Sequence, residues 1–377
     1  MLVNADLHIH SSFSGGTSSK ISMESIAEGA KKKGLHIVAT GDCLHPIWER
    51  EIKGHYRNGM AEVDGIHFLL SVEVEDMNRV HHLLLFPDFD AAHQFGDMVK
   101  RKASGMEHEG RPRLNMNGME IMDIALECNA LIGPAHAFTP WTSLYAYFDS
   151  VLDYYGRKPH FLELGLSADS NYADRIGELQ SIPFLSNSDA HSSSPHRLGR
   201  EFNRLEVEEI TWDEIRKAIL KGKIKRNAGF PPEKGKYNRT ACNSCHRKYD
   251  MEKAREMKWK CRCGGVIKKG VRDRVNELAD FEEARHPEWR GEYVHILPLA
   301  EIIAVALNED ANSSIVRRRW EEMTRRRSEI EILLDVDIDE IRRISPPAVA
   351  HAIEAFRKGN VEIIPGGGGK YGEIVIK

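Results

Sequence analysis

The sequence predicts a mixed α/β protein with three parts: a barrel of seven β-α units, a small metal-binding module and a mainly helical C-terminal domain. Over the first 230 residues, short apolar runs alternate with amphipathic stretches, as is typical of parallel α/β folds. Four cysteines then cluster in a basic segment, and helix signals dominate the rest of the chain. We expect the domains to span 1–232, 233–274 and 275–377.

The composition fits a folded protein of several domains. The 377 residues are 41% hydrophobic and 29% charged, enough to bury a sizeable core. The net charge of −4 is unevenly distributed, because residues 1–235 carry 26 basic and 33 acidic side chains whereas residues 236–377 carry 27 and 24. No apolar run approaches the roughly 18 residues of a membrane span, and residues 1–10 are too short and polar for a signal peptide. We therefore expect a cytoplasmic protein.

Seven strand candidates and their intervening helices define the predicted barrel. The strand candidates are 3–9, 36–40, 66–74, 82–86, 130–134, 160–166 and 183–186. Among the helices, 23–33 begins after Ser22 and ends at Gly34, which matches the usual start and stop signals. In such barrels the chemistry lies where strands end and loops begin.

The C-terminal region is predicted to be helical. We expect an apolar helix at 297–307, a long charged helix at 312–334, and another helix that opens at Ser345-Pro346-Pro347 and closes at Gly359. A terminal hairpin, 361–364 with 371–376, flanks a run of four glycines. No helix that carries Lys and Ser/Thr follows this run, as a phosphate-binding loop would require, so we expect a flexible hairpin turn there.

Two histidines stand at the end of the first strand candidate. His8 and His10 are two residues apart, so both side chains point to the same side of the strand. Both imidazoles can then reach one cation. Paired histidines also occur simply as hydrogen-bonding groups, so the interpretation depends on similar residues elsewhere.

Acidic or imidazole side chains recur after nearly every later strand candidate. They are Asp42, His45, Glu73, His81, His82, His136, Glu163, Asp189 and His191. Any one of these residues could have an ordinary structural role. Core packing does not explain why metal-binding side chains recur at the ends of seven strands. Imidazoles mixed with carboxylates suit Zn²⁺, Mn²⁺ or Fe²⁺. We expect two or three ions, bridged by a carboxylate such as Glu73 or Asp189. Such ions catalyse the hydrolysis of phosphate esters, a reaction that Mg²⁺ also supports.

Only one of His81 and His82 can face these ions, because neighbours on a strand point to opposite faces. We expect His82, since it directly precedes the apolar strand. The predicted ligands are thus His8, His10, Asp42, His45, Glu73, His82, His136, Glu163, Asp189 and His191. Of these, the predicted catalytic residues are Asp189, Glu73, His191, Asp42 and His45.

Several of these residues stand in motifs that resemble the PHP superfamily of metalloenzymes. The motifs are the His8/His10 pair, Asp42 in a Gly-Asp turn, Glu73 after Leu-Ser-Val, His136 in Pro-Ala-His, and Ser188-Asp189-Ala190-His191. The resemblance implies a distorted (β/α)7 PHP barrel over residues 1 to about 230. Many PHP enzymes place His directly after the Asp of the second motif, whereas Cys43 and Leu44 separate Asp42 from His45 here.

The chain is more specifically similar to the endonuclease Q branch of that superfamily. The similar stretches are TGDCLHPIW at 40–48, AHAFTPW at 135–141, GLSAD at 165–169, SNSDAHS at 186–192, LGRE at 198–201, the clustered cysteines and 293–303. This resemblance implies a DNA repair endonuclease that nicks 5′ of hypoxanthine, uracil, xanthine or an abasic site. Its partner would be double-stranded or single-stranded DNA that carries a damaged base. A replication or repair protein is a second possible partner, and we expect no association with a membrane.

The four clustered cysteines predict a structural zinc site. Cys242 and Cys245 form one pair, Cys261 and Cys263 form the second, and 15 residues separate the pairs. Two close pairs at this interval can surround one Zn²⁺ with four thiolates, and redox activity is the alternative. A module of this size has little core, so zinc would supply much of its folding energy.

Basic and aromatic residues of this region are candidates for nucleic-acid contact. Residues 234–274 carry 14 Lys and Arg against 4 acidic residues. The candidates are Lys258, Lys260, Arg262, Lys268 and Lys269, with Trp141 from an aromatic stretch that follows His136. The alternatives are a solvated basic face and aromatic core packing. The arginine triplets 317–319 and 325–327 fit either phosphate contact or salt bridges with nearby glutamates.

The sequence therefore predicts a metal-dependent DNA endonuclease in which the barrel ions activate water and the basic modules hold the DNA. A damaged base pairs weakly, so it costs less to flip out of the helix. A small-molecule phosphatase of the histidinol-phosphate type is the main rival, because it uses the same ions but needs no basic zinc module. The complete ligand set disfavours a protein that only binds its target without cleaving it.

Overall fold

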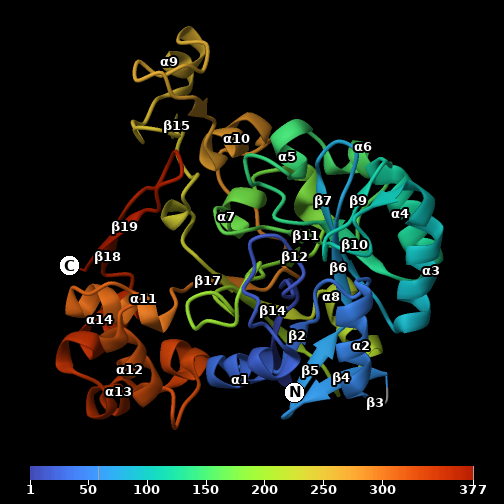
Figure 1. The fold of residues 1–377 in the computed structure, drawn as a ribbon. Coiled ribbons are helices and arrows are strands. Elements are labelled where there is room, and N and C mark those ends of the chain that lie inside the picture. The colour runs from blue at the N-terminus through green and yellow to red at the C-terminus, as the bar shows by residue number, and fades with distance from the viewer. Residues whose placement is uncertain (58, 377) are drawn as a thin grey trace.

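Two sheets form the framework of the structure, a computed structural model that describes residues 1–57 and 59–376 (Figure 1). The larger sheet has eight strands in the order β17-β14-β13-β1-β2-β5-β4-β3. Its strands are β1 (Leu2–Asp6), β2 (Ile37–Ala39), β3 (Tyr56–Arg57), β4 (Met60–Val63), β5 (Ile66–Leu69), β13 (Phe202–Glu206), β14 (Ile224–Gly229) and β17 (Glu292–His295).

Strand β1 lies in the middle of this sheet. It pairs in parallel with β2 and antiparallel with β13, where Leu2 lies opposite Glu206. Val3 and Ala5 are fully buried, and the polar side chains of Asn4 and Asp6 on the same strand are buried as well. The chain that leaves β1 therefore enters the interior of the protein, where His8 and His10 follow.

The second sheet has five strands in the order β10-β7-β6-β9-β8. They are β6 (Ser71–Glu75), β7 (His81–Leu85), β8 (Ala103–Ser104), β9 (Arg113–Leu114) and β10 (Leu131–Pro134). A separate pair, β11 (Leu162–Glu163) and β12 (Phe184–Leu185), runs in parallel. The single strand expected at 66–74 is two strands, because the chain passes from one sheet to the other at Leu70.

The mixed α/β class is confirmed, whereas a closed parallel barrel is not seen. Within residues 1–57 and 59–376 the strand ladders form separate sheets. The pairs β1–β2 and β2–β5 are parallel, but β6–β7, β7–β10 and β1–β13 are antiparallel. Antiparallel neighbours need no helical crossover, which explains why β6 and β7 follow one another directly.

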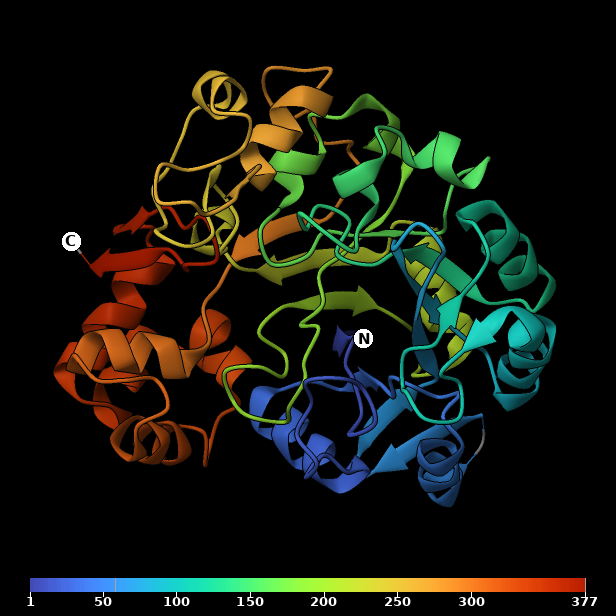
Figure 2. The same cartoon turned by 45° about the horizontal axis from the view of Figure 1, so that its top comes forward.

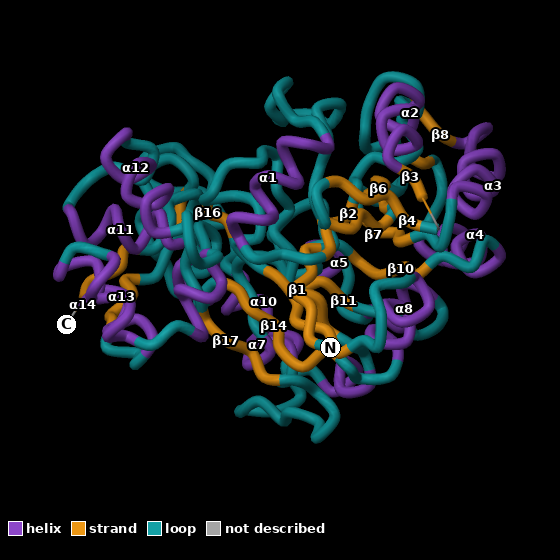
Figure 3. The backbone as a smooth tube through the Cα atoms, turned by 90° about the horizontal axis from the view of Figure 1, so that it is seen from below, coloured by secondary structure: helices purple, strands orange, loops and turns teal. Residues whose placement is uncertain are grey.

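Helices surround the sheets (Figures 1 and 3). In the view of Figure 3, strands occupy the middle of the molecule, with α2, α3 and α4 on one side and α11–α14 on the other. The helices around the sheets are α1 (Met23–Lys33), α2 (Pro46–His55), α3 (Phe89–Val99), α4 (Gly118–Glu127), α5 (Leu144–Tyr147), α6 (Val151–Tyr155), α7 (Ser170–Ala173) and α8 (Trp212–Leu220).

Helix α1 has the bounds expected from the sequence. The Ser22 side chain accepts a hydrogen bond from the Ser25 N–H, and the Ser25 side chain accepts one from the Ser22 N–H, which is a reciprocal cap. Gly34 ends the helix with φ 91°, a left-handed conformation that favours glycine. The prediction for 23–33 is confirmed.

A small cysteine module projects from the rest of the protein (Figure 1). It consists of β15 (Ala241–Cys242), α9 (Met251–Glu256), β16 (Ile267–Lys268) and the adjoining α10 (Val271–Leu278). Among the described residues, the buried members of its apolar core are Cys242, Ala254, Cys261 and Ile267. A core this small needs additional support.

The C-terminal helices form a unit with its own apolar core beside α1 (Figure 2). The unit contains α11 (Leu299–Leu307), α12 (Ser314–Met323), α13 (Ile338–Ile344), α14 (Pro347–Arg357), and the terminal hairpin β18 (Val361–Ile364) and β19 (Glu373–Ile376). Within residues 1–57 and 59–376, none of the helices has the length and apolar character needed to cross a bilayer.

The long charged helix expected at 312–334 is divided in two. α12 stops at Met323, where the Thr324 hydroxyl donates to the Trp320 carbonyl at 2.8 Å. A second helical segment starts at Glu329, after Ser328, whose hydroxyl accepts from the Glu331 N–H at 3.3 Å, and ends in a π-helical turn, Glu331–Asp335. Hydroxyl side chains that bond to local backbone groups in this way compete with helix continuation.

Candidate metal centre and its surroundings

The first candidate ligands follow β1. His8 and His10 are buried, and their ring centroids lie 5.2 Å apart. Ile9 forms a parallel bridge with Ala190, and the His10 N–H donates to the Ala190 carbonyl at 2.9 Å. The end of β1 and the loop that follows β12 therefore present their side chains to one place.

His8, His10 and Asp189 form the first ligand group. Their ligand atoms all lie within 4.8 Å of one another. Asp189 Oδ1 is 3.3 Å from His10 Nε2 and 3.9 Å from His8 Nε2. Two imidazoles and a carboxylate are a ligand set that Zn²⁺, Mn²⁺ and Fe²⁺ accept.

Glu73, His81 and His136 form the second ligand group. Glu73 Oε1 lies 2.9 Å from His81 Nδ1 and 2.9 Å from His136 Nε2. Glu73 belongs to β6, His81 to the antiparallel neighbour β7, and His136 follows β10 on the other side of β7. Three adjacent strands of one sheet thus supply this group.

The expectation that His82 faces the ligands is corrected, because the structure places His81 there. Neighbours on β7 point to opposite faces, and His82 is buried on the other face. Its ring contacts the Tyr155 hydroxyl at 2.6 Å and Asp76 Oδ2 at 3.1 Å. These partners satisfy both ring nitrogens.

Glu73 joins the two groups. Its Oε2 lies 3.4 Å from His10 Nε2 and its Oε1 lies 3.7 Å from His8 Nε2. A carboxylate between two sets of imidazoles can bridge two cations. The arrangement therefore offers a site for at least two adjacent divalent ions.

The buried nitrogen atoms of this cluster fit metal ions. Among the described residues, His8 Nε2 and His10 Nε2 have no hydrogen-bond partner although both are buried. An unsatisfied buried nitrogen is costly, and a cation would satisfy both. Burial lowers the pKa of His8, but the charges of Glu163, Glu73 and Asp189 outweigh it and raise this pKa to about 9. The same negative surroundings favour a divalent cation.

Asp42 and Glu163 hold the imidazoles from behind. Glu163 Oε2 lies 2.9 Å from His8 Nδ1, and Asp42 Oδ1 lies 3.2 Å from His10 Nδ1. The Ser11 and Ser14 hydroxyls donate to the other oxygen of Asp42 at 2.6 and 2.9 Å. Contacts of this kind fix the orientation of a metal-binding histidine. In the structure Asp42 and Glu163, both predicted as ligands, therefore contact the imidazoles and lie outside the two ligand groups.

His45 and His191 lie near the ligand groups without joining either of them. The His191 ring centroid is 4.6 Å from that of His10, and His191 Nδ1 donates to the Asp189 carbonyl at 3.0 Å. His45 is buried and stacks on Phe13 at 4.0 Å. Its Nδ1 has no hydrogen-bond partner within the described residues.

Three residues of the cluster have a left-handed backbone. The φ angles are 46° for Asp42, 32° for His136 and 47° for Asp189. Non-glycine residues rarely adopt such angles, and where they do the surroundings hold them in place, often at functional sites. This strain places the three side chains at sharp turns directly after strands.

A cavity of about 270 Å³ opens beside the ligand groups. Its lining includes His136, Asp189 and His191. Aromatic rings and cations also line it, namely Trp141, Tyr237, Tyr371, Arg197, Arg200 and Lys236. Trp141 packs edge-on against Tyr237 at 4.4 Å, and Lys268 Nζ lies 5.2 Å from the Trp141 ring centroid.

The other aromatic residues after His136 divide between core and surface. Phe138 and Tyr145 are buried and stack on one another at 4.9 Å, so they belong to the core. Tyr147 remains exposed. Of the predicted stretch, Trp141 alone lines the cavity beside the ligand groups, among the residues that the structure describes.

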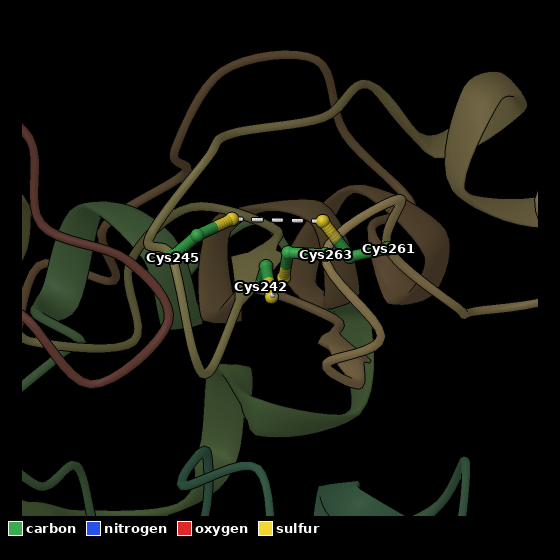
Figure 4. A group of neighbouring side chains, drawn as sticks. All are labelled: Cys242, Cys245, Cys261 and Cys263. Carbon is green, nitrogen blue, oxygen red and sulfur yellow. Dashed lines mark hydrogen bonds between the residues drawn. The ribbon is translucent and has the colours of Figure 1, made fainter.

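The four clustered cysteines converge, as Figure 4 shows. Sγ of Cys245 faces Sγ of Cys261 at 3.5 Å, and Cys242 faces Cys263 at the same distance. A disulfide requires about 2 Å, whereas zinc–thiolate bonds of ~2.3 Å separate the sulfur atoms of a tetrahedral site by ~3.8 Å. The spacing therefore fits a four-thiolate zinc site.

The predicted basic contacts occupy two places on the module. Lys258, Lys260 and Arg262 are exposed. Lys268 lies over the Trp141 ring, and Lys269 pairs with Glu277 at 2.6 Å. In the arginine triplet of α12, by contrast, all three side chains pair with glutamates of the same helix, which supports the salt-bridge interpretation.

Sequence reasoning missed Arg111, the serines that hold Asp42, and Asn187. Arg111 Nη1 donates to Glu73 Oε2 at 2.9 Å. The Asn187 amide donates to Glu163 and its oxygen accepts from the Leu7 N–H. Ser11 and Asn187 directly adjoin recognised motifs, which was the available signal. No sequence signal pointed to Arg111, because it lies in a loop between two strands of two residues each.

Comparison with solved structures gives two close matches over the whole chain. The lesion-specific endonuclease PfuEndoQ from Pyrococcus furiosus is 52% identical, with a TM-score of 0.95 over 100% of this chain and 96% of that chain. An endonuclease Q complex with a 27-mer duplex containing an abasic lesion at the active site is also 52% identical, with a TM-score of 0.96 and coverages of 100% and 97%.

Comparison with known sequences and family models gives further matches, among them the Bacillus subtilis protein YqxK, which is 31% identical over 99% of both chains. Residues 298–360 match the family model of the MJ0043 C-terminal domain. The protein MJ0043 of Methanocaldococcus jannaschii is 50% identical over 249 residues, which are 64% of this chain. The chain spans about a third (32%) of the length of that relative.

The two structural matches have high sequence identity and cover the four-cysteine module, the ligand groups and the C-terminal helices together. The resemblance inferred from the sequence motifs is therefore confirmed: the chain belongs to the endonuclease Q family.

Proposed function

We propose that this protein is a metal-dependent DNA repair endonuclease that nicks the strand 5′ of a deaminated or abasic nucleotide. The observation that carries the proposal is the pair of ligand groups joined by Glu73, beside a cavity lined by aromatic rings and cations. Family membership supports it, since a relative of this fold was crystallised with an abasic lesion at its active site.

We assign the metal ligands from the two groups. His8, His10 and Asp189 would hold one ion, His81 and His136 would hold another, and Glu73 would bridge them. When bound, such ions supply a hydroxide at neutral pH and stabilise the charge that develops on the phosphate. Asp42 and Glu163 keep the imidazole rings oriented, and His191 stays adjacent as a further ligand or proton donor.

The cavity beside the ligands would receive the damaged nucleotide. Trp141, Tyr237 and Tyr371 offer aromatic surfaces for an extruded base, while Arg197 and Lys236 offer positive charge for its phosphates. Base stacking on aromatic side chains tolerates different bases. A site of this composition therefore suits hypoxanthine, uracil and xanthine alike, and weak pairing of these bases favours their extrusion.

The zinc module would hold the duplex next to this cavity. Lys258, Lys260 and Arg262 project from the module into solvent, where they can contact phosphates. Lys268 bridges the module to Trp141 at the cavity wall. We expect the affinity for DNA to reside mainly in these residues.

We further propose that residues 1–232 form the catalytic domain, as a distorted PHP barrel, with the zinc module at 233–274 and the helical domain at 275–377. The separate apolar cores of the module and of the C-terminal helices support this division.

A nicking assay tests the proposal. The purified protein is incubated with Mn²⁺, Mg²⁺ or Zn²⁺ and a labelled duplex that contains one deoxyinosine, deoxyuridine or abasic site. We expect one nick 5′ of the lesion and none in the matched undamaged duplex. Histidinol phosphate is assayed in parallel, since a phosphatase of that type uses the same ions. Release of phosphate without cleavage of DNA would favour the phosphatase and reject the endonuclease.

A further inference from the structure

Arg111 enters the metal centre from outside the ligand strands. It lies in the hairpin loop between β8 and β9, and its Nη1 donates to Glu73 Oε2 at 2.9 Å. Glu73 is 1% exposed, whereas the Arg111 side chain is 32% exposed. The partly exposed guanidinium therefore contacts a carboxylate that is itself closed to solvent.

Backbone contacts on both sides of Arg111 fix its position. The Gly110 N–H donates to the Phe13 carbonyl at 3.0 Å, and the Pro112 carbonyl accepts from the Glu75 N–H at 3.0 Å. A Cβ at Gly110 would lie 2.3 Å from the Asp42 carboxyl group, so the loop closes tightly on the ligands. Residues that are held in this way are preorganised for a function at the site.

The charge of Arg111 has a different role in the metal-free protein than in the metal-bound protein. In the metal-free protein its guanidinium compensates the buried carboxylate of Glu73, near the further charges of Asp189 and Glu75. A divalent cation that binds Glu73 competes with this guanidinium and repels it. Among the described residues Glu73 is the one hydrogen-bond partner of Arg111, so competition frees a planar group with five donors.

We propose that Arg111 contacts the phosphate of the DNA strand that is cut, and that Glu73 holds it in place until metal ions occupy the centre. Guanidinium groups bind phosphate oxygens through two parallel hydrogen bonds. Arg111 would thus bind the non-bridging oxygens of the phosphate and stabilise their charge as the bond to the leaving oxygen breaks. The inference rests on the proposed nuclease function.

The test compares Arg111→Gln with Arg113→Gln in the full-length protein. Arg113 belongs to the same hairpin, is 65% exposed and lies 3.7 Å from Glu75, so it is a matched control. For Arg111→Gln we expect a nicking rate lower by about 10² to 10³, the usual effect of losing one such donor. We also expect Mn²⁺ to bind at least about threefold tighter by calorimetry, because the competitor for Glu73 is gone. Arg113→Gln should change neither quantity.

Arg111→Lys separates charge from geometry, since lysine keeps the charge but loses the paired donors. We expect its Mn²⁺ affinity to stay near that of the wild type and its nicking rate to remain impaired. Unchanged or weaker Mn²⁺ binding by Arg111→Gln would overturn the inference, as would a nicking rate equal to that of Arg113→Gln. If the wild-type protein nicks no lesion, both the proposed function and the phosphate contact are rejected. Tighter Mn²⁺ binding by Arg111→Gln would still show that Arg111 competes with the metal for Glu73.

Discussion

Lys33 and Glu329 form a buried ion pair, with Lys33 Nζ 2.6 Å from Glu329 Oε1. Lys33 is the last residue of α1, and Glu329 lies between α12 and α13 of the C-terminal unit. Glu329 also accepts hydrogen bonds from the Leu299 N–H and from the Trp320 indole. The pair thus fastens the C-terminal helices to the part of the chain that carries the metal ligands.

Lys33→Ala should destabilise the protein strongly. Removal of one partner leaves the other charge buried and uncompensated, which typically costs about 3–5 kcal/mol. We expect the thermal unfolding midpoint to fall by several degrees. Lys32→Ala is the control, because Lys32 forms an exposed pair with Glu28 that contributes at most about 1 kcal/mol. Equal midpoints for the two variants would contradict the role of the buried pair.

Asp189→Asn should abolish nicking and leave DNA binding largely intact. The carboxylate belongs to the first ligand group, whereas the proposed DNA contacts lie on the zinc module. A nicking assay and a mobility-shift assay on the same folded protein check the two activities. Asp97→Asn, an exposed change in α3, should affect neither. Comparable losses of nicking and DNA binding would show that catalysis and DNA binding do not reside in separate parts of the protein.

Cys261→Ser should release zinc and weaken DNA binding. Its sulfur belongs to the four-sulfur cluster and forms a hydrogen bond with the Tyr249 hydroxyl at 3.0 Å. Since the module buries so few apolar residues, loss of the metal should unfold it locally. Atomic absorption measures the zinc content, and Cys128→Ala, at the end of α4, should retain it. A variant that binds DNA with the wild-type salt dependence would show that the module does not hold the duplex.

The stability of the protein should decline as the pH rises from 5 to 8, in part because of Glu201. Burial raises the pKa of this carboxyl group from 4.5 to about 8. Between these values the folded protein keeps a proton that the unfolded chain releases, so the stabilisation is complete below about pH 4.5 and lost above about pH 8.

Glu201→Gln should therefore flatten the pH dependence of the thermal midpoint over this range. Burial also raises the pKa of Asp6 to about 6. The thermal midpoint of Glu201→Gln should therefore still decline slightly up to about pH 6. Glu209→Gln, an exposed change, should keep the wild-type slope. An identical slope for Glu201→Gln and the wild type would show that Glu201 is ionised in the folded protein.

The features that sequence predicts well are those that local geometry determines. His8 and His10 share a side because they are two residues apart on an extended chain, and α1 has the predicted bounds because Ser22 and Gly34 act through adjacent backbone groups. The four cysteines converge as expected, since each pair is close in the chain.

The features that sequence did not predict depend on contacts between distant segments. Every residue of β7 is buried, so the hydrophobic pattern carries no information on whether His81 or His82 faces the ligands. Arg111 reaches Glu73 through the pairing of β9 with β6, which a two-residue strand does not reveal. The antiparallel order of the second sheet likewise follows from tertiary packing.

The pairing of Leu2 with Glu206 bears on how the protein is made. Because β1 lies between β2 and β13 in the large sheet, a ribosome must release more than two hundred residues before the N-terminal strand gains its second neighbour. His8 and His10 leave the exit tunnel long before Asp189 joins them. A nascent chain thus carries an incomplete set of ligands, and the capacity to break a phosphodiester bond arises only late in synthesis.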